Sequence, residues 1–208
     1  MLYSDRNWQL LRALATGIRL IAPHQLARWW GVPVANAKRS LRELVNSGFL
    51  VETAIRARKL PPLTEPILQW KPGDHQPNFG AISYQAKERN RGLAPVMMAA
   101  YTPTNQTLSQ FAVRRHAKLK SSQATHELGL TEAYLFAVKR WPRLTRKCWR
   151  GENLYANERA HGEKVEDAHL VHPTKLHVML AIEYAGTYHK SRFEALHEAL
   201  KHNPYWIM

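Results

Sequence analysis

Residues 24–50 constrain the fold most tightly, because their apolar spacing predicts two short helices joined by a turn and followed by a strand. Gly31 is placed to end the first helix as a C-cap glycine does, and Pro33 is placed to begin the second. Apolar residues recur at intervals of three and four on both sides of that turn: Leu26, Trp29 and Trp30 before it, and Val34, Ala37, Leu41, Leu44 and Val45 after it. The second helix is expected to end at residues 46–48, and residues 49–51 are typical of a strand.

The other faces of the second helix carry polar and basic residues. A helix in this position enters the DNA major groove in helix-turn-helix proteins, where Arg and Lys suit guanine edges and Asn suits adenine. The predicted reading residues are Asn36, Lys38, Arg39 and Arg42, and the predicted phosphate contacts are Arg56, Arg58 and Lys59. The alternatives are a helical hairpin with a solvated basic face and a disordered basic loop after the strand.

The stretch RSLRELVNSGFLVE resembles the end of a winged-helix domain, in which recognition helix, turn and wing strand follow one another. Ser4 and Asp5 can cap a first helix, with Trp8, Leu11, Leu14 and Ala15 as its apolar stripe, so the resemblance extends over residues 5–60. It implies a winged helix-turn-helix DNA-binding domain over residues 1–60.

Charge is concentrated in the N-terminal part of the chain. The net charge is +14, and residues 1–125 hold 18 Lys and Arg against 6 Asp and Glu, whereas residues 126–208 hold 12 against 10. Such a surplus favours a polyanionic partner, because neutralised phosphates release counterions. Double-stranded DNA is the expected partner, and structured RNA is the alternative.

Composition also sets expectations about the compartment. A single cysteine, Cys148, excludes an internal disulfide and a cysteine-rich zinc site, as expected for a reducing cytosol. The sequence shows neither a signal peptide nor an apolar run long enough to span a bilayer. We therefore expect a cytoplasmic, nucleoid-associated protein with no membrane partner.

Residues 61–125 are expected to form an ordered connector. Prolines and glycines between residues 60 and 80 disfavour a long regular element there, and helices are predicted over residues 81–91 and 104–120, with a short strand or helix over residues 95–101. The last of these helices carries a second basic cluster that can extend the nucleic-acid surface: Arg114, Arg115, Lys118 and Lys120.

Residues 126–208 predict a separate α/β domain. The expected order is a helix over residues 131–141, strands over 147–152, 168–171 and 176–184, a helix over 191–202 and a last strand over 205–208. The run LHVMLAIEY is apolar at consecutive positions, which is typical of an interior strand. The whole chain is therefore expected to be α+β.

This order resembles the αβββαβ core of the PD-(D/E)XK nuclease superfamily. The resemblance places Asp167 and Glu183 at adjacent strand ends, and it implies that they hold a Mg or Mn ion that activates water for phosphodiester cleavage. Glu152 is an auxiliary acidic candidate. The lysine of the family belongs two positions after Glu183, where this chain has Ala185, so Lys190 is the candidate substitute.

The chain also resembles replication-relaxation proteins of plasmids and integrative elements, through the motifs HELGLT at residues 126–131, EDA at 166–168 and IEY at 182–184. That resemblance implies a mobile genetic element as the setting.

We expect a DNA-binding protein with a degenerate nuclease-like domain that needs no cofactor. The alternatives are an active metal-dependent endonuclease and an adaptor that recruits a protein partner through residues 126–208.

Overall fold

A computed structural model of the chain describes residues 4–114, 116, 119–155 and 166–208, and it has a mixed α+β architecture. Two compact units are present. The first unit comprises residues 1–59 and 94–135, and the second comprises residues 60–93 and 136–208. This division differs from the three consecutive segments expected, because residues 61–125 are shared between the units and do not form a connector of their own.

The three predicted N-terminal helices are present in the first unit. They are α1 (Asp5–Thr16), α2 (Pro23–Trp30) and α3 (Val34–Asn46). Ser4 caps α1 as predicted, because its Oγ accepts a hydrogen bond of 3.2 Å from the backbone amide of Asn7. Gly31 ends α2 with a φ of 64°, in the left-handed region that glycine adopts without strain.

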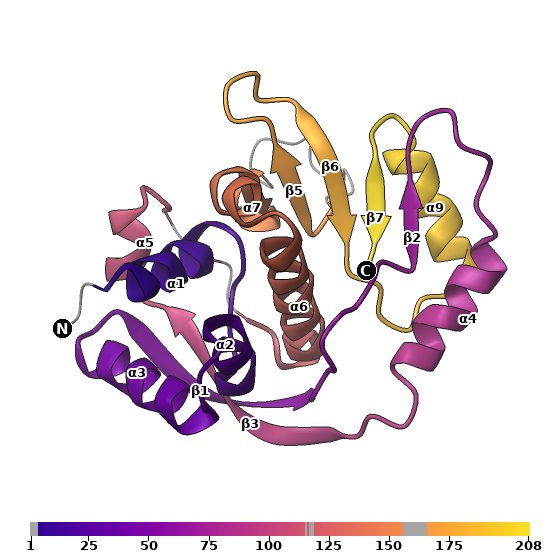
Figure 1. Cartoon of the computed structure of the whole chain (residues 1–208). Coiled ribbons are helices and arrows are strands. Elements are labelled where there is room, and N and C mark those ends of the chain that lie inside the picture. Colours follow the sequence, from indigo (N-terminus) through magenta and orange to yellow (C-terminus); the bar gives the residue numbers. More distant parts are fainter. Residues whose placement is uncertain (1–3, 115, 117–118, 156–165) are drawn as a thin grey trace. The chain divides into compact units, whose positions relative to one another are not determined.

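A two-stranded antiparallel sheet follows these helices. Strand β1 (Leu50–Arg58) pairs along its whole length with β3 (Pro95–Pro103), from Leu50 opposite Pro103 to Arg58 opposite Pro95. Ile21, between α1 and α2, adds an isolated antiparallel bridge to Tyr101 of β3. Residues 59–94 therefore lie in sequence between two strands that are hydrogen-bonded to each other (Figure 1). The alternative of a disordered basic loop after residue 51 is wrong, because β1 continues to Arg58.

The predicted helix over residues 104–120 is wrong at residues 111–114, 116, 119 and 120, and its residues 115, 117 and 118 lie outside the part of the chain that the structure describes. Helix α5 covers only Asn105–Gln110, and Ala112 follows with a φ of 57°. A non-glycine residue in this region interrupts a right-handed helix. Phe111 packs instead on Trp8, with ring centroids 4.7 Å apart. Trp8 was expected in the apolar stripe of α1, but its side chain is 43 % exposed.

The 3₁₀ turn Ser121–Gln123 leads into α6 (Ala124–Arg140), which begins earlier than the helix predicted over residues 131–141. The boundary between the two units falls within α6, so this helix belongs to both.

The second unit contains a five-stranded mixed sheet in the order β2-β7-β6-β5-β4. Strand β6 (Val178–Glu183) lies in the middle, as predicted for the run LHVMLAIEY. It is parallel to β7 (Tyr205–Ile207) and antiparallel to β5 (Ala168–Val171). The outer strands are β4 (Trp149–Gly151) and β2 (Leu68–Trp70), and β2 was not predicted.

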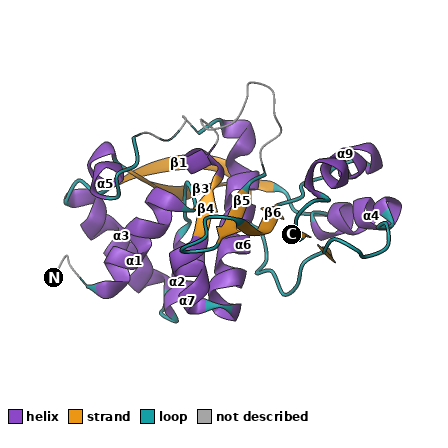
Figure 2. Ribbon diagram, turned by 90° about the horizontal axis from the view of Figure 1, so that it is seen from above, coloured by secondary structure: helices purple, strands orange, loops and turns teal. Residues whose placement is uncertain are grey.

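Helices cover both faces of this sheet. Helix α9 (Lys190–Leu200) leads from β6 to β7 and packs beside α4 (Phe79–Arg89), which Figures 1 and 2 show from two sides. Tyr205 and Ile207 of β7 share a buried core with these helices, whereas Trp206 between them stacks on Trp141 at 5.0 Å, just after α6. Consecutive strand residues point to opposite faces, so the unit has three layers. The remaining helices, which were not predicted, are α7 (Pro142–Cys148) and α8 (Glu152–Tyr155).

Truncation at two positions of α3 tests which face supports the fold. Leu41 is fully buried, so Leu41→Ala is expected to lower the free energy of unfolding by about 2–5 kcal/mol. Val34 was predicted to be apolar and buried, but it is 44 % exposed, so Val34→Ala should cost less than about 1 kcal/mol. Urea unfolding of both variants measures the difference, and equal losses would contradict this orientation of α3.

Candidate nucleic-acid interface and acidic site

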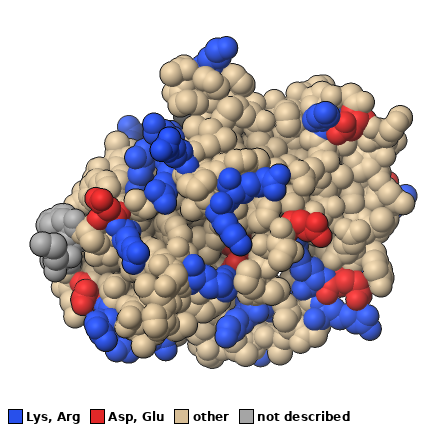
Figure 3. All heavy atoms as spheres, viewed as in Figure 1, with Lys and Arg blue, Asp and Glu red and all other residues tan. Residues whose placement is uncertain are grey.

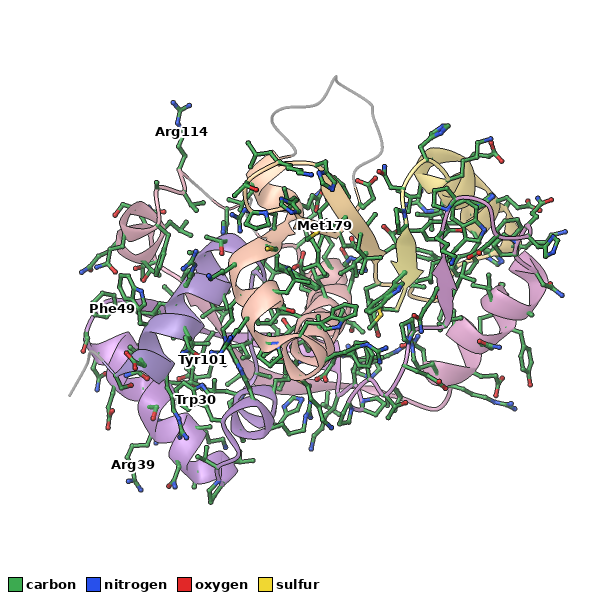
Figure 4. The ribbon with its side chains drawn as sticks, turned by 45° about the horizontal axis from the view of Figure 1, so that its top comes forward. Trp30, Arg39, Phe49, Tyr101, Arg114 and Met179 are labelled. Atoms are coloured by element: carbon green, nitrogen blue, oxygen red, sulfur yellow. The ribbon has the colours of Figure 1, made fainter. Side chains whose placement is uncertain are left out.

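Helix α3 presents a polar and basic face to solvent. Its inner face is fixed by Ala37, Leu41 and Leu44, which are completely buried. Figure 4 shows the Arg39 side chain pointing away from the helix. The predicted reading residues are all exposed: Asn36, Lys38, Arg39 and Arg42. None of these four side chains forms a salt bridge or a side-chain hydrogen bond with another residue that the structure describes. They are therefore available to a partner.

Two other arginines of the first unit are used inside it. Arg19 Nη1 donates to Glu127 Oε1 at 2.7 Å, and Arg28 Nη2 pairs with Glu132 Oε1. Both glutamates are buried, and burial raises the pKa of Glu132 although Gln25 and Arg28 oppose that shift. These ion pairs connect the helical N-terminal segment to α6. Some of the basic residues of the first unit therefore serve internal packing and are not part of a solvated basic surface.

The β1 end of the first unit carries the predicted phosphate contacts. Arg56 and Lys59 are exposed, whereas Arg58 is half-buried and its backbone amide donates to Thr125 Oγ1 at 3.0 Å. Figure 3 shows Lys and Arg outnumbering acidic side chains on the face in view. Arg114 of the second basic cluster is exposed and points outward in Figure 4, and Arg115 lies outside the described residues.

A further polar group beside α3 was not predicted. The Tyr101 hydroxyl donates to Glu52 Oε2 at 2.8 Å, which holds the Glu52 carboxylate on the β1–β3 sheet. The pKa of Tyr101 is raised to about 12, mainly by burial and next by the Glu52 carboxylate. The positive charge of Arg42 opposes this rise. Arg42 therefore lies close enough to this pair to act on it. Only the cross-strand register, which places Glu52 opposite Tyr101, brings these residues together.

The acidic pair of the second unit lies at the end of the central strand. Glu183 is 2 % exposed and ends β6, and Asp167 precedes β5, whose Ala168 pairs with Ile182. The backbone amide of Tyr184 donates to Asp167 Oδ2 at 2.7 Å, which fixes that carboxylate beside the end of β6. The register thus places Asp167 and Glu183 at neighbouring strand ends.

Tyr188 and Arg192 complete this site, and sequence reasoning missed both. The Tyr188 hydroxyl lies 3.4 Å from Glu183 Oε1, and its pKa is raised by burial first and then by the charges of Glu183 and Asp167. Arg192 opposes that shift, and its guanidinium carbon lies 5.4 Å from the centroid of the Tyr188 ring. Lys190, the candidate lysine, is exposed and lies 3.5 Å from Glu194 Oε1. The basic side chain that lies against Tyr188 is therefore that of Arg192.

Two further acidic residues, Glu152 and Glu166, lie near Asp167 along the chain or across the backbone. Glu152 is exposed, and its backbone amide donates to the Asp167 carbonyl at 3.0 Å. Glu166 Oε2 lies 3.1 Å from His169 Nε2. Among the residues that the structure describes, no group of three or more His, Cys, Asp or Glu is arranged to hold a metal ion. Asp167 and Glu183 offer two carboxylates, a number that suits a Mg ion retaining several waters but not a structural metal.

Comparisons with known proteins give no family assignment, since no family model matches the chain and neither a curated protein nor a solved structure shows significant similarity to it. Over the described residues, no helix has both the length and the apolar character needed to cross a membrane.

His24, at the start of α2, gives a test by pH. The pKa of His24 is lowered from 6.5 to about 4. Burial is the largest cause, and the positive charges of Arg28 and Lys59 add to it. The unfolded chain therefore takes up a proton at a higher pH than the folded chain, so stability falls as pH drops from 6.5 to 4. We expect His24→Gln to reduce this loss by about 1 kcal/mol, a value discounted because the imidazole is only half-buried.

Urea unfolding at a series of pH values measures this loss. His75→Gln, at an exposed position outside the described helices and strands, is the matched control and should keep the loss of stability that His24 causes. Identical profiles for all three proteins would contradict the assigned environment of His24.

Proposed function

We propose that the first unit is a winged helix-turn-helix domain that binds double-stranded DNA, with α3 in the major groove. The order of elements supports this proposal, because α1, the bridging residue Ile21, α2, α3 and the β1–β3 pair follow one another as in such domains. In this proposal the β1–β3 pair is the wing, and the phosphate contacts come from Arg56, Arg58 and Lys59.

One observation carries the proposal most strongly. Four polar or basic side chains of α3 face solvent without partners among the described residues, while Arg19 and Arg28 of the same unit pair with buried glutamates. Arg and Lys bind guanine edges and phosphates, and Asn binds adenine. We assign Asn36, Lys38, Arg39 and Arg42 to the reading face. The setting in a mobile genetic element remains part of the proposal and rests on the short motifs alone.

Removal of two α3 arginines tests the reading face. Arg39→Ala with Arg42→Ala is expected to weaken DNA binding at least about tenfold and to reduce the salt slope of log K by about 2, because two cationic contacts are lost. A gel-shift series between low and physiological salt measures both quantities.

The matched control changes two exposed arginines of α1, Arg6→Ala with Arg12→Ala, which alters net charge equally. If both double variants lost the same affinity, binding would depend on total charge and α3 would not be the recognition helix.

We propose that the second unit is a nuclease-like domain of PD-(D/E)XK type that does not cleave DNA. The sheet order β4-β5-β6-β7 with α9 between β6 and β7 supports the architecture. The absence of a lysine at position 185 and the engagement of Lys190 with Glu194 support the lack of cleavage.

The second candidate function is metal-dependent DNA cleavage. It is favoured by three charged side chains that act on Tyr188, namely Glu183, Asp167 and Arg192. In that case Asp167 and Glu183 would hold a Mg or Mn ion, which supplies activation of water. Arg192 would stand in for the missing lysine as the positive group near the attacked phosphate.

Supercoiled plasmid nicking with Mg or Mn separates the two candidates. We expect the wild type to bind plasmid without nicking it. Nicking by the wild type that Asp167→Asn and Glu183→Gln abolish, with DNA binding unchanged, would replace our proposal with the endonuclease. Nicking that persists in both variants would indicate contamination.

A further inference from the structure

Strand β1 has an outer edge that no described strand occupies. Tyr101 exchanges both backbone hydrogen bonds with Ile21, so Glu52, which lies opposite Tyr101, directs its amide and carbonyl away from β3. The amide of Arg58 also points away from β3, toward Thr125 Oγ1. Strand residues alternate in direction, so the backbone groups of Ala54 and Arg56 face the same outer edge. An unpaired edge of this kind is a template for another strand.

The sequence of β1 is complementary to itself in one antiparallel register. If two copies pair about a two-fold axis at Ala54, Glu52 of each copy lies opposite Arg56 of the other. A two-fold axis at Glu52 would place the two Glu52 side chains opposite each other, and an axis at Arg56 would do the same with the two Arg56 side chains. A two-fold axis at Ile55 would place Glu52 of one copy opposite Arg58 of the other. In that register the Arg58 amide is needed for the ladder, but it is already bonded to Thr125. Over residues 52–56 the Ala54 register alone opposes unlike charges. Leu50 lies opposite Arg58 in this register, and that last pair stays outside the ladder because the Arg58 amide is bonded to Thr125.

The exposed face of β1 that carries Glu52, Ala54 and Arg56 fits this register. Glu52 is held in place by the Tyr101 hydroxyl, and Arg56 lies opposite Met97, so neither lies opposite an unlike charge within its own sheet. On the other face Ile55 and Ala57 are buried within their own copy, so the cross-strand contacts of the dimer come from the face of Glu52 and Arg56. Cross-strand pairs of opposite charge stabilise a sheet.

We propose that two copies of the chain form a two-fold symmetric dimer by antiparallel pairing of their β1 strands, centred on Ala54, with Glu52 of each copy against Arg56 of the other. The dimer does not require DNA binding, although both proposals use Arg56. In the dimer Arg56 is engaged by the second copy, which leaves Arg58 and Lys59 for phosphates. The ladder is short and buries less than the roughly 1,200–2,000 Å² of a standard interface, so association should be reversible and concentration-dependent.

Charge reversal tests the register. Sedimentation velocity over a concentration series should show a monomer–dimer equilibrium for the wild type. Glu52→Arg and Arg56→Glu each place like charges opposite one another, so each should weaken the dimer at least about tenfold. The double variant restores opposite charges and should restore dimerisation. Glu43→Arg, an equal charge change on the exposed face of α3, is the matched control and should dimerise as the wild type does.

Cysteine crosslinking is a second measurement that leaves the fold undisturbed. Opposed residues of a hydrogen-bonded antiparallel pair lie about 5.5 Å apart at Cα, a separation that a disulfide can span. Ala54→Cys should therefore form a covalent dimer under mild oxidation. Ala35→Cys, an equally small change at an exposed site on α3, should not, and the native Cys148 is buried.

Three results would overturn the proposal. They are a wild type that stays monomeric at the highest concentration, a double reversal that remains as weak as the single ones, and equal crosslinking of Ala54→Cys and Ala35→Cys.

Discussion

Pairing of β1 with β3 is the contact on which the architecture of the chain depends. The two strands are separated by residues 59–94, and their ends must meet before the first unit is complete. Closing so long a loop costs entropy, but that cost rises only slowly with loop length, so an inserted segment is tolerated. Nine paired positions, the Ile21 bridge and the Arg58 contact with Thr125 together offset it.

Buried carboxylates decide which basic residues of the first unit remain free. Glu127 and Glu132 lie on α6 and take Arg19 and Arg28, respectively. Removing such a charge from water is expensive unless a partner compensates it, so these pairs must form whenever the helices pack. The basic residues of α3 and the end of β1 have no such role within the described residues. The same surplus charge thus serves folding at one place and recognition at another.

Sequence reasoning identified the elements that local patterns define and missed what distant pairing defines. Apolar spacing and the glycine at position 31 located α2 and α3, and the unbroken apolar run located the central strand β6. The helix predicted beyond Gln110 is wrong because the backbone of Ala112 has a positive φ. Alanine favours helices, so nothing in the sequence indicates this conformation. Arg192 was missed because only the packing of α9 brings it to Tyr188, while Lys190 matched the expected residue type. For the nucleic-acid face, α3 could be predicted, but the link from Glu52 to Tyr101 could not.

The interleaving of the two units limits how the chain can be divided. A fragment ending at residue 59 would lack β3 and leave β1 without its described partner strand, and it would also lose Glu127 and Glu132 from beneath Arg19 and Arg28. A fragment beginning at residue 136 would lack β2 and α4, and so would uncover Tyr205 and Phe193 in the core of the sheet. Neither half of this chain is a self-sufficient module, and its two units must therefore be inherited, expressed and folded as one polypeptide.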